Sequence, residues 1–191
     1  MSGSATFPCI ATERLLLREI VETDASQLFS IHGDPQLMQW FGVDPVPDMQ
    51  GALALVALFA NWRKLPNPGT RWAIQMRDDP ILLGTCGLFG WNRTARKCVI
   101  GFELAAAAQG QGLMQEALRA IMSWGFANME LNRIEAQIHP DNQPSLKLAH
   151  RLGFVLEGRL RQGAYWGGRF HDLLQFSLLR SDWDISNQEP A

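Results

Sequence analysis

The sequence predicts one α/β domain, and three features lead to that class. A chain of 191 residues suits one full-sized core better than two small ones. Residues 70–105 have the pattern of three consecutive strands separated by short turn-like segments, which is typical of an antiparallel meander. After residue 110 the chain alternates helix-like and strand-like patterns. We therefore expect a single domain over residues 1–191, with residues 1–12 and 185–191 as loose termini.

The first half of the chain begins with a strand and a short helix. Residues 14–20 alternate loosely between apolar and polar side chains, as a half-buried strand does. Thr23 or Asp24 then stands where an amphipathic helix needs an N-cap. The elements expected after this helix are, in order, an apolar helix over residues 51–64 and strands over residues 70–79, 80–92 and 97–105.

Residues 34–51 have the composition of a loop but carry large apolar side chains. The segment holds three prolines and the adjacent pair Trp40 and Phe41. Two interpretations remain open: the aromatic pair lines a pocket, or it fills the hydrophobic core.

The second half supplies the alternating elements. Apolar residues recur at helical spacing after Gly112, so this helix should lie against a sheet. Gly153 stands where a second helix ends. The elements expected, in order, are a helix over residues 112–128, a strand over 133–140, a helix over 143–152, and strands over 154–166 and 169–179.

The composition excludes several functional classes. The formal net charge is -2, and no basic stripe indicates nucleic-acid binding. The N-terminus lacks the pattern of a secretory signal, and no apolar run approaches the ~20 residues of a membrane span, so the cytoplasm is the expected compartment. Cys9, Cys86 and Cys98 are widely spaced, and we expect reduced thiols, two of them in strands, and no metal site.

Two glycines directly before the third helix need a reason, because glycine loses much conformational freedom on folding. The first-turn N–H groups of a helix attract anions, and Gly110 and Gly112 lack the Cβ atoms that would keep a phosphate away. A tight turn without a ligand is one alternative. The dinucleotide fingerprint G-x-G-x-x-G is another, but Gln115 stands where its third glycine belongs.

Four segments together resemble one family. They are "TERLLLREI" (residues 12–20), "VIGFELAAAAQGQGLMQEAL" (99–118), "LNRIEAQIHPDNQPSLKLAHRLGFVLEGRLR" (131–161) and "FHDLLQFSLLRSDW" (170–183). The series is similar to the acetyl-coenzyme A dependent N-acetyltransferases of the GNAT superfamily, and within it to the RimJ/RimL branch of ribosomal-protein N-terminal acetyltransferases and their relatives. The resemblance implies a mixed, mostly antiparallel sheet of about seven strands, splayed at its centre and flanked by helices.

The resemblance assigns the glycines a ligand. The family's pyrophosphate motif, Q/R-x-x-G-x-G/A, matches at Gln109 and Gly112, while Met114 departs from its Gly/Ala position, as is common in this branch. It implies that backbone N–H groups of residues 110–114 hold the pyrophosphate of acetyl-coenzyme A and that the pantetheine arm pairs with backbone near Leu104. The residues so implied are Leu104, Ala105, Gln109, Gly110, Gln111, Gly112, Leu113, Met114, Asn142 and Ser145.

Catalysis needs a base for the amine and a proton for the departing thiolate. The resemblance favours Glu103 as the base, acting through water, with a structural carboxylate as the competing view. Many relatives protonate the thiolate with a tyrosine, but that position is Ala149 here. Ser145 and Tyr165, the only tyrosine, are the candidates that remain.

The acceptor is expected to sit between the loop of Trp40 and Phe41 and the turn of Tyr165. Asp172, or His171 beside it, is a further candidate for contact with the amine, and a structural pair is the alternative. We interpret His139 as a polar residue at a strand end. Ribosomal enzymes of the branch often carry a glutamate directly before the tyrosine, where Ala164 stands here, which argues against a ribosomal substrate.

The sequence therefore predicts an acetyl-coenzyme A dependent N-acetyltransferase that transfers acetyl to a primary amine by direct attack in a ternary complex. A weak base suits an N-terminal α-amine better than lysine, because its deprotonation at neutral pH costs roughly 3 kcal/mol less. A small-molecule amine, such as an amino acid, polyamine or amine toxin, is the alternative acceptor. A non-catalytic sensor that binds coenzyme A is the alternative role, and a homodimer is compatible with the resemblance.

Overall fold

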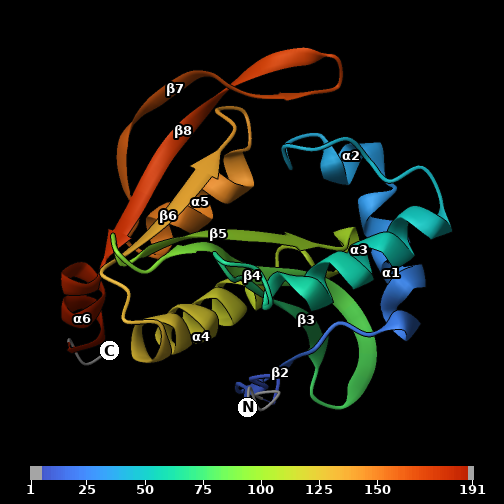
Figure 1. The fold of residues 1–191 in the computed structure, drawn as a ribbon, viewed down its shortest axis with the longest axis horizontal. Helices are drawn as coiled ribbons and strands as arrows, with labels where there is room; N and C mark the ends of the chain where they lie inside the picture. Colours follow the sequence, from blue (N-terminus) through green and yellow to red (C-terminus); the bar gives the residue numbers. More distant parts are fainter. Residues whose placement is uncertain (1–5, 189–191) are drawn as a thin grey trace.

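The computed structural model describes residues 6–188 as an open eight-stranded sheet flanked by helices (Figure 1). The sheet order is β1-β2-β3-β4-β5-β6-β8-β7. The strands are β1 (Ile10–Ala11), β2 (Leu15–Arg18), β3 (Thr70–Met76), β4 (Asp79–Asn92), β5 (Lys97–Leu104), β6 (Arg133–Ile138), β7 (Val155–Trp166) and β8 (Arg169–Leu179). The α-helices are α1 (Ala25–His32), α2 (Pro35–Met38), α3 (Met49–Trp62), α4 (Leu113–Asn128), α5 (Gln143–Arg151) and α6 (Arg180–Gln188), and the 3-10 helices are η1 (Glu22–Asp24) and η2 (Ala106–Ala108).

The predicted fold class and the antiparallel meander β3–β4–β5 are confirmed, with differences at the margins. The sheet has eight strands rather than about seven because Ile10 and Ala11, within the segment expected to be loose, pair with β2. The predicted loop contains the short α2. The helix expected over residues 51–64, α3, begins at Met49, because the Asp48 carboxylate caps it by accepting a hydrogen bond from Gly51 N at 2.9 Å.

The predicted N-cap of α1 has a different partner. Asp24 does occupy the cap position, but its side chain makes no capping hydrogen bond to the helix. The buried Asp24 carboxylate instead accepts from Arg18 at 2.7 and 2.8 Å and from Val21 N at 2.9 Å. A bidentate guanidinium pairs with a buried carboxylate more strongly than a backbone amide does, which explains the difference.

The sheet consists of two parts joined by a short parallel pairing. β5 and β6 pair only over Lys97↔Arg133, Cys98↔Ile134 and Val99↔Glu135. Beyond these residues β5 stays with β4 and β6 stays with β8, so the two parts diverge. This is the central splay that the family resemblance implies.

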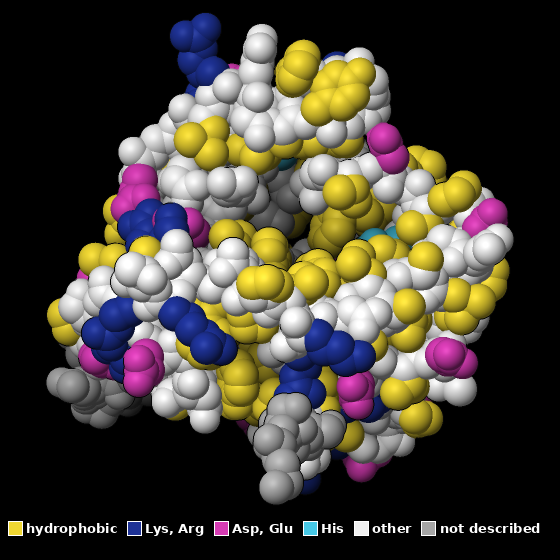
Figure 2. All heavy atoms as spheres, viewed as in Figure 1, with side chains coloured by type: hydrophobic (Ala, Val, Ile, Leu, Met, Phe, Trp, Pro, Cys, Tyr) yellow, Lys and Arg dark blue, Asp and Glu magenta, His cyan; other side chains and the backbone are white. Residues whose placement is uncertain are grey.

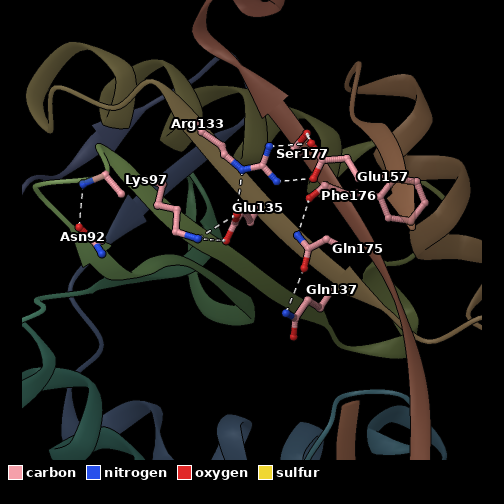
Figure 3. A network of polar contacts seen from close by, with 10 residues as sticks. Asn92, Lys97, Arg133, Glu135, Gln137, Glu157, Gln175, Phe176 and Ser177 are labelled. Carbon is pink, nitrogen blue, oxygen red and sulfur yellow. Dashed lines mark hydrogen bonds and ion pairs between the residues drawn. The ribbon is translucent and has the colours of Figure 1, made fainter. Parts of the chain in front are cut away.

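Charged side chains cross the joined end of the sheet (Figure 3). Lys97 Nζ lies 3.2 Å from Glu135, which also accepts from Arg133 Nε at 2.7 Å. The same guanidinium donates to Glu157 on β7 at 2.7 Å, and Ser177 donates to Glu157 at 2.8 Å. The Arg133 and Ser177 hydrogen bonds lower the pKa of Glu157 to about 2. The network therefore ties β5, β6, β8 and β7 together where the sheet is still continuous.

The two faces of the sheet carry separate hydrophobic cores. We call them the α4 face, against which α4 packs, and the α1–α3 face, which those two helices cover over β3 and β4 (Figure 1). The α4 face includes Trp72, Leu88, Leu118, Ile121, Met122 and Phe176. The α1–α3 face includes Ile20, Leu28, Val56, Phe59, Ala73 and Leu82.

The three cysteines fall into two environments. Cys86 on β4 and Cys98 on β5 are buried, as expected of strand residues, whereas Cys9 is exposed. Burial raises the pKa of Cys98 to about 12 and also raises the pKa of Cys86. Over residues 6–188, no helix is both long and apolar enough to cross a membrane.

Gly84 sets the distance between β4 and the end of β5. A Cβ at this position would overlap the Glu103 carbonyl oxygen and lie 2.8 Å from Leu104 Cα. We expect Gly84→Ala to lower stability by about 1–3 kcal/mol through overpacking, measured by urea denaturation. Gly158→Ala is the matched control, since a Cβ there meets nothing within 4 Å. Equal midpoints for both variants would contradict this account.

Candidate functional site

The turn before α4 is open on its outer side. Gly110 and Gly112 both have φ +76°, a left-handed conformation that favours glycine. A Cβ on Gly110 would meet nothing within 4 Å, and one on Gly112 would meet only Arg14 Nη2, at 3.6 Å. The N-terminus of α4 has no side-chain cap, like that of α1, whereas α2, α3 and α5 have one. The N–H groups of this turn can therefore donate hydrogen bonds to a bound anion.

Arg14, directly before β2, contacts this turn and pairs with Glu116 in the first turn of α4, which the sequence did not predict. Arg14 Nη1 donates to Gln111 O at 3.0 Å, and its Nε donates to Glu116 at 2.7 Å. Thr12 also donates to Glu116, at 2.6 Å. Burial alone would raise the pKa of Glu116, but the hydrogen bonds from Thr12 and Arg14 lower it. The partners lie 102 residues apart, so no local pattern could indicate the contact.

The side chains around the turn are compatible with an anion on its outer side. Leu113 and Met114 are buried in the core of the α4 face, so the methionine at the Gly/Ala position of the motif does not obstruct the turn. Gln109 Nε2 donates to Leu104 O at 3.1 Å. Ala105 N donates to Leu83 O at 2.8 Å, so this N–H faces β4 and not the splay, contrary to the expected pairing with pantetheine.

Asn142 and Ser145 lie together on the other side of the splay, at the start of α5. Asn142 Oδ1 accepts from Ser145 N at 3.2 Å and caps the helix. Asn142 N donates to His139 O at 3.0 Å, which closes the turn after β6. Since its oxygen is engaged by the cap, the Asn142 amide offers its NH₂ group to a ligand.

Glu103 lies in a buried polar group that we call the carboxylate cluster: Glu103, Arg71, Thr85 and His32. Arg71 on β3 and Thr85 on β4 both donate to the carboxylate. His32 Nε2 lies 3.1 Å from Glu103 Oε1, the oxygen that also accepts from Thr85, while Arg71 contacts Oε2. Arg71 Nε also donates to Thr85 at 2.6 Å. All four residues are buried. The carboxylate therefore has partners on both oxygens.

The carboxylate cluster keeps Glu103 ionised. Burial alone would raise the pKa of Glu103, but Arg71, followed by His32 and Thr85, outweighs burial and lowers it. An ionised, fully paired carboxylate with a lowered pKa is a weak proton acceptor. The geometry thus favours the structural interpretation of Glu103 over the role of base.

A second group, which we call the aromatic cluster, comprises the buried His139, Trp166 and His171 and the partly buried Trp40. The rings of Trp40 and His139 stack at 4.1 Å, and those of Trp166 and His171 stack at 3.5 Å. His139 Nε2 lies 3.3 Å from His171 Nδ1, and Trp166 Nε1 donates to Gln39 O at 3.2 Å. The cluster joins the loop after α2 to the ends of β6, β7 and β8.

Trp40 and Phe41 contact opposite sides of the splay. Phe41 packs edge-on against His32 at 5.3 Å and lies under the Arg71 guanidinium at 5.7 Å, both on the β5 side. Trp40 stacks on His139, on the β6 side. The surface is hollowed in this region, between the β7–β8 hairpin and the α2 segment, with hydrophobic side chains around it (Figure 2). The aromatic pair thus contacts both sides of the splay, and the interpretation that it lines a pocket stays a prediction.

A pocket of about 460 Å³ lies beside the aromatic cluster. It lies between the loop around α2 and the β7–β8 turn. A hydrogen bond of 2.7 Å, from Gly167 N to Asp44, joins these two segments beside the pocket. Its lining residues are Pro35, Met38, Gln39, Val43, Asp44, Pro45, Trp166, Gly167, Arg169 and His171.

Tyr165 and Asp172 lie apart from these clusters. Tyr165 is 60 % exposed and packs on Phe170 at the hairpin tip, with ring centroids 5.0 Å apart. Asp172 accepts from Arg159 Nε at 2.6 Å and from Gln162 N at 2.7 Å. The Gln162 and Arg159 hydrogen bonds lower the pKa of Asp172. This carboxylate pins an irregularity in β7, where Gln162 has φ +51°, which matches the structural alternative.

Comparison with known proteins gives a consistent result. A model of the acetyltransferase (GNAT) domain matches residues 14–155. The uncharacterized N-acetyltransferase p20 of Bacillus licheniformis is 33% identical over 172 residues, covering 90% of this chain and 96% of the relative. YoaA of Bacillus subtilis, also an uncharacterized N-acetyltransferase, is 30% identical over 174 residues, covering 91% and 98%. The putative ribosomal N-acetyltransferase YdaF of the same organism is 27% identical over 180 residues, covering 93% and 98%.

Solved structures agree with this result. The crystal structure of a probable acetyltransferase has a TM-score of 0.82 at 25% identity and covers 92% of this chain and 99% of its own. RimL, a ribosomal-protein α-N-acetyltransferase in complex with coenzyme A, has a TM-score of 0.80 at 22% identity and covers 90% and 98%. At 22% identity, the likeness to RimL shows the fold alone.

Arg71 should be essential for stability because it is the ion-pair partner of the buried Glu103 carboxylate. We expect Arg71→Leu to destabilise the protein by about 3–5 kcal/mol, measured by urea denaturation at pH 7. Arg159→Leu, which removes the half-exposed pair with Asp172, should cost under about 1 kcal/mol. Because folding lowers the pKa of Glu103, the wild-type advantage should be complete above about pH 4.3 and decline as pH falls below it. Equal losses in the two variants would refute this role.

Proposed function

The chain belongs to the acetyltransferase (GNAT) domain family and is an N-acetyltransferase, and on that basis we propose that it transfers the acetyl group of acetyl-coenzyme A to a primary amine. Acetyl-coenzyme A supplies the activated acyl group as a thioester. The amine attacks it directly while both substrates are bound, so the protein's main contributions are positioning and charge stabilisation.

The open turn before α4 is the proposed pyrophosphate site. The two left-handed glycines leave space for phosphate oxygens next to the N–H groups of residues 110–114. Arg14 holds the Gln111 carbonyl and brings a positive charge to the rim of the turn. The pantetheine arm would enter the splay between β5 and β6, where the Asn142 NH₂ group is available to it.

The acceptor site is proposed between the two clusters on the α1–α3 face. Phe41 lies against the carboxylate cluster, and Trp40 lies against the aromatic cluster. An amine placed between them would reach the splay from the face opposite α4. Apolar ring surfaces here would exclude water from the attacking nitrogen.

The paired state of Glu103 carries the proposal for the type of amine. With this carboxylate engaged by Arg71, Thr85 and His32, it is a poor base for a strongly basic amine. An N-terminal α-amine, with a pKa of ~8, is neutral far more often at pH 7 than a lysine at ~10.4. We therefore assign a protein or peptide N-terminus as the acceptor. Glu103 then orders the site electrostatically.

Ser145 is the proposed proton source for the thiolate. It lies at the start of α5 beside Asn142, on the β6 side of the splay. Tyr165 is left out of the chemistry, since its ring is exposed and packs on Phe170.

The pocket beside the aromatic cluster supports a second candidate. Its volume of about 460 Å³ falls in the range of small-molecule sites, and Asp44 at its rim would attract a cation. A small amine, such as a polyamine or an amine toxin, is therefore the alternative acceptor.

Gly112→Glu tests the coenzyme site. We expect it to abolish coenzyme A binding, measured by isothermal titration calorimetry, because it brings a carboxylate to the pyrophosphate position. Gly90→Glu is the matched control: Gly90 also has positive φ, at +62°, with nothing within 4 Å of its Cβ, and it lies on β4. The control should share the backbone strain and retain binding. Unchanged binding in Gly112→Glu would exclude this site.

The acceptor is tested by following coenzyme A release by mass spectrometry. The panel holds peptides with free N-termini, N-blocked lysine peptides, amino acids, polyamines and aminoglycosides. We expect turnover of the free N-terminal peptides only. Turnover confined to a small amine would transfer the assignment to the alternative acceptor. Tight coenzyme binding without any turnover would indicate a non-catalytic sensor instead.

A further inference from the structure

We propose that His139 is a positioning residue that connects the two halves of the reaction site. Its neutral imidazole, protonated at Nε2, holds Trp40 on the acceptor side and the turn of Asp141 and Asn142 on the coenzyme side. The inference rests on the proposed function for the names of these two sides. The contacts themselves do not depend on it.

The hydrogen bonds of the ring nitrogens define one tautomer. Asp141 N donates to His139 Nδ1 at 3.1 Å, so Nδ1 must carry a lone pair and the proton must be on Nε2. The Nε2–H group then donates to His171 Nδ1 at 3.3 Å. His171 in turn carries its proton on Nε2 and donates to Trp166 O at 3.2 Å. Every ring nitrogen in this chain has a partner when both histidines are neutral.

The ring of His139 is also enclosed by other rings. Trp40 stacks on it at 4.1 Å with an interplanar angle of 20°. Trp166 meets it edge-on at 5.9 Å, and His171 does so at 5.3 Å. With both nitrogens bonded and the ring enclosed, His139 has one orientation available. Trp40 therefore stacks on an imidazole ring whose orientation is fixed relative to β6, the strand that ends directly before His139.

The backbone of His139 continues into the coenzyme side. Asn142 N donates to the His139 carbonyl at 3.0 Å, while Asn142 Oδ1 caps α5. The His139 side chain accepts a hydrogen bond from the N–H of Asp141, the residue before Asn142. One residue thus contacts the Trp40 ring through its face and the turn of Asn142 through its backbone and Nδ1.

Protonation would break this arrangement at Nδ1. A proton there would point at the Asp141 N–H, so that hydrogen bond would be lost, and the Asp141 carboxylate, now 3.8 Å away, would become the better partner. The turn of Asp141 and Asn142 would have to rearrange. The Trp40 ring, which attracts a cation, would stay in contact. The expected effect of protonation is therefore on the coenzyme side.

The surroundings of His139 favour the neutral form. Burial lowers the pKa of His139 the most. Arg169 lowers it too, as does a proton on His171, whereas the negative Asp141 and Asp172 raise it, and the net direction is down from 6.5. A histidine with a lowered pKa contributes its full stability above about pH 6.5 and loses it as pH falls below that value. The arrangement is therefore intact at neutral pH.

Nuclear magnetic resonance of the free enzyme tests the inference without any substrate. In ¹⁵N-labelled protein at pH 8, long-range imidazole correlations should show His139 with its proton on Nε2, and a proton on Nδ1 would overturn the proposal. On titration to pH 5.5, the backbone amides of Asp141 and Asn142 should shift with the ionisation of His139 itself, below 6.5. Amides that do not respond would also overturn it.

Two variants separate this effect from general titration. His139→Phe keeps a ring against Trp40 but has no titrating nitrogen, so the amide shifts should vanish, and their persistence would contradict the proposal. His150→Gln removes the exposed histidine near the end of α5, the helix that Asn142 caps, and should leave the shifts unchanged. If His139→Phe does not fold, the wild-type tautomer and titration decide. None of these outcomes affects the turnover assay, so the proposed function is tested separately.

Discussion

The structure depends on how briefly β5 and β6 pair. Three residue pairs join the two parts of the sheet, and the ion pairs of Lys97, Glu135 and Arg133 cross the same short segment. Past Val99 each strand keeps one neighbour and has one unpaired edge. An unpaired edge inside a sheet is costly unless something else satisfies it, and an extended ligand with amide groups is suited to that edge. The joint therefore both holds the domain together and creates the space that we propose for the reaction.

Each side of this space ends in one of the two clusters, the carboxylate cluster and the aromatic cluster, and they have different chemistry. On the β5 side, charges of opposite sign neutralise each other around Glu103. On the β6 side, neutral rings and histidine nitrogens form a chain without formal charge. Only two adjacent residues, Trp40 and Phe41, are needed to contact both sides, because consecutive side chains project in different directions. This division leaves little basic character at the centre of the frame, which is why we propose a weakly basic amine as the acceptor.

Much of the fold could be predicted from the sequence, since alternation and helical spacing are local signals. They located β3, β4, β5 and α4 closely, and the glycines at 110 and 112 do adopt left-handed conformations. The partners of Glu103 could not be predicted, because Arg71, Thr85 and His32 come from three elements that meet only after folding. For Asp172 the sequence left two roles open, contact with the amine or a structural pair, and its partners Arg159 and the Gln162 amide become visible only once β7 and β8 are paired. The stack of Trp40 on His139 likewise joins residues that are remote in sequence.

The distribution of the cysteines has a practical consequence for thiol chemistry. Cys86 and Cys98 are enclosed within the sheet and remain protonated, so the folded chain presents a single accessible thiol, Cys9, to a disulfide or maleimide reagent. A chromogenic reagent that counts free coenzyme A would therefore meet one equivalent of protein background, which is consumed before turnover begins. The same side chain, next to the Pro8 carbonyl that accepts from the Trp72 indole, would carry one fluorophore per molecule without any substitution.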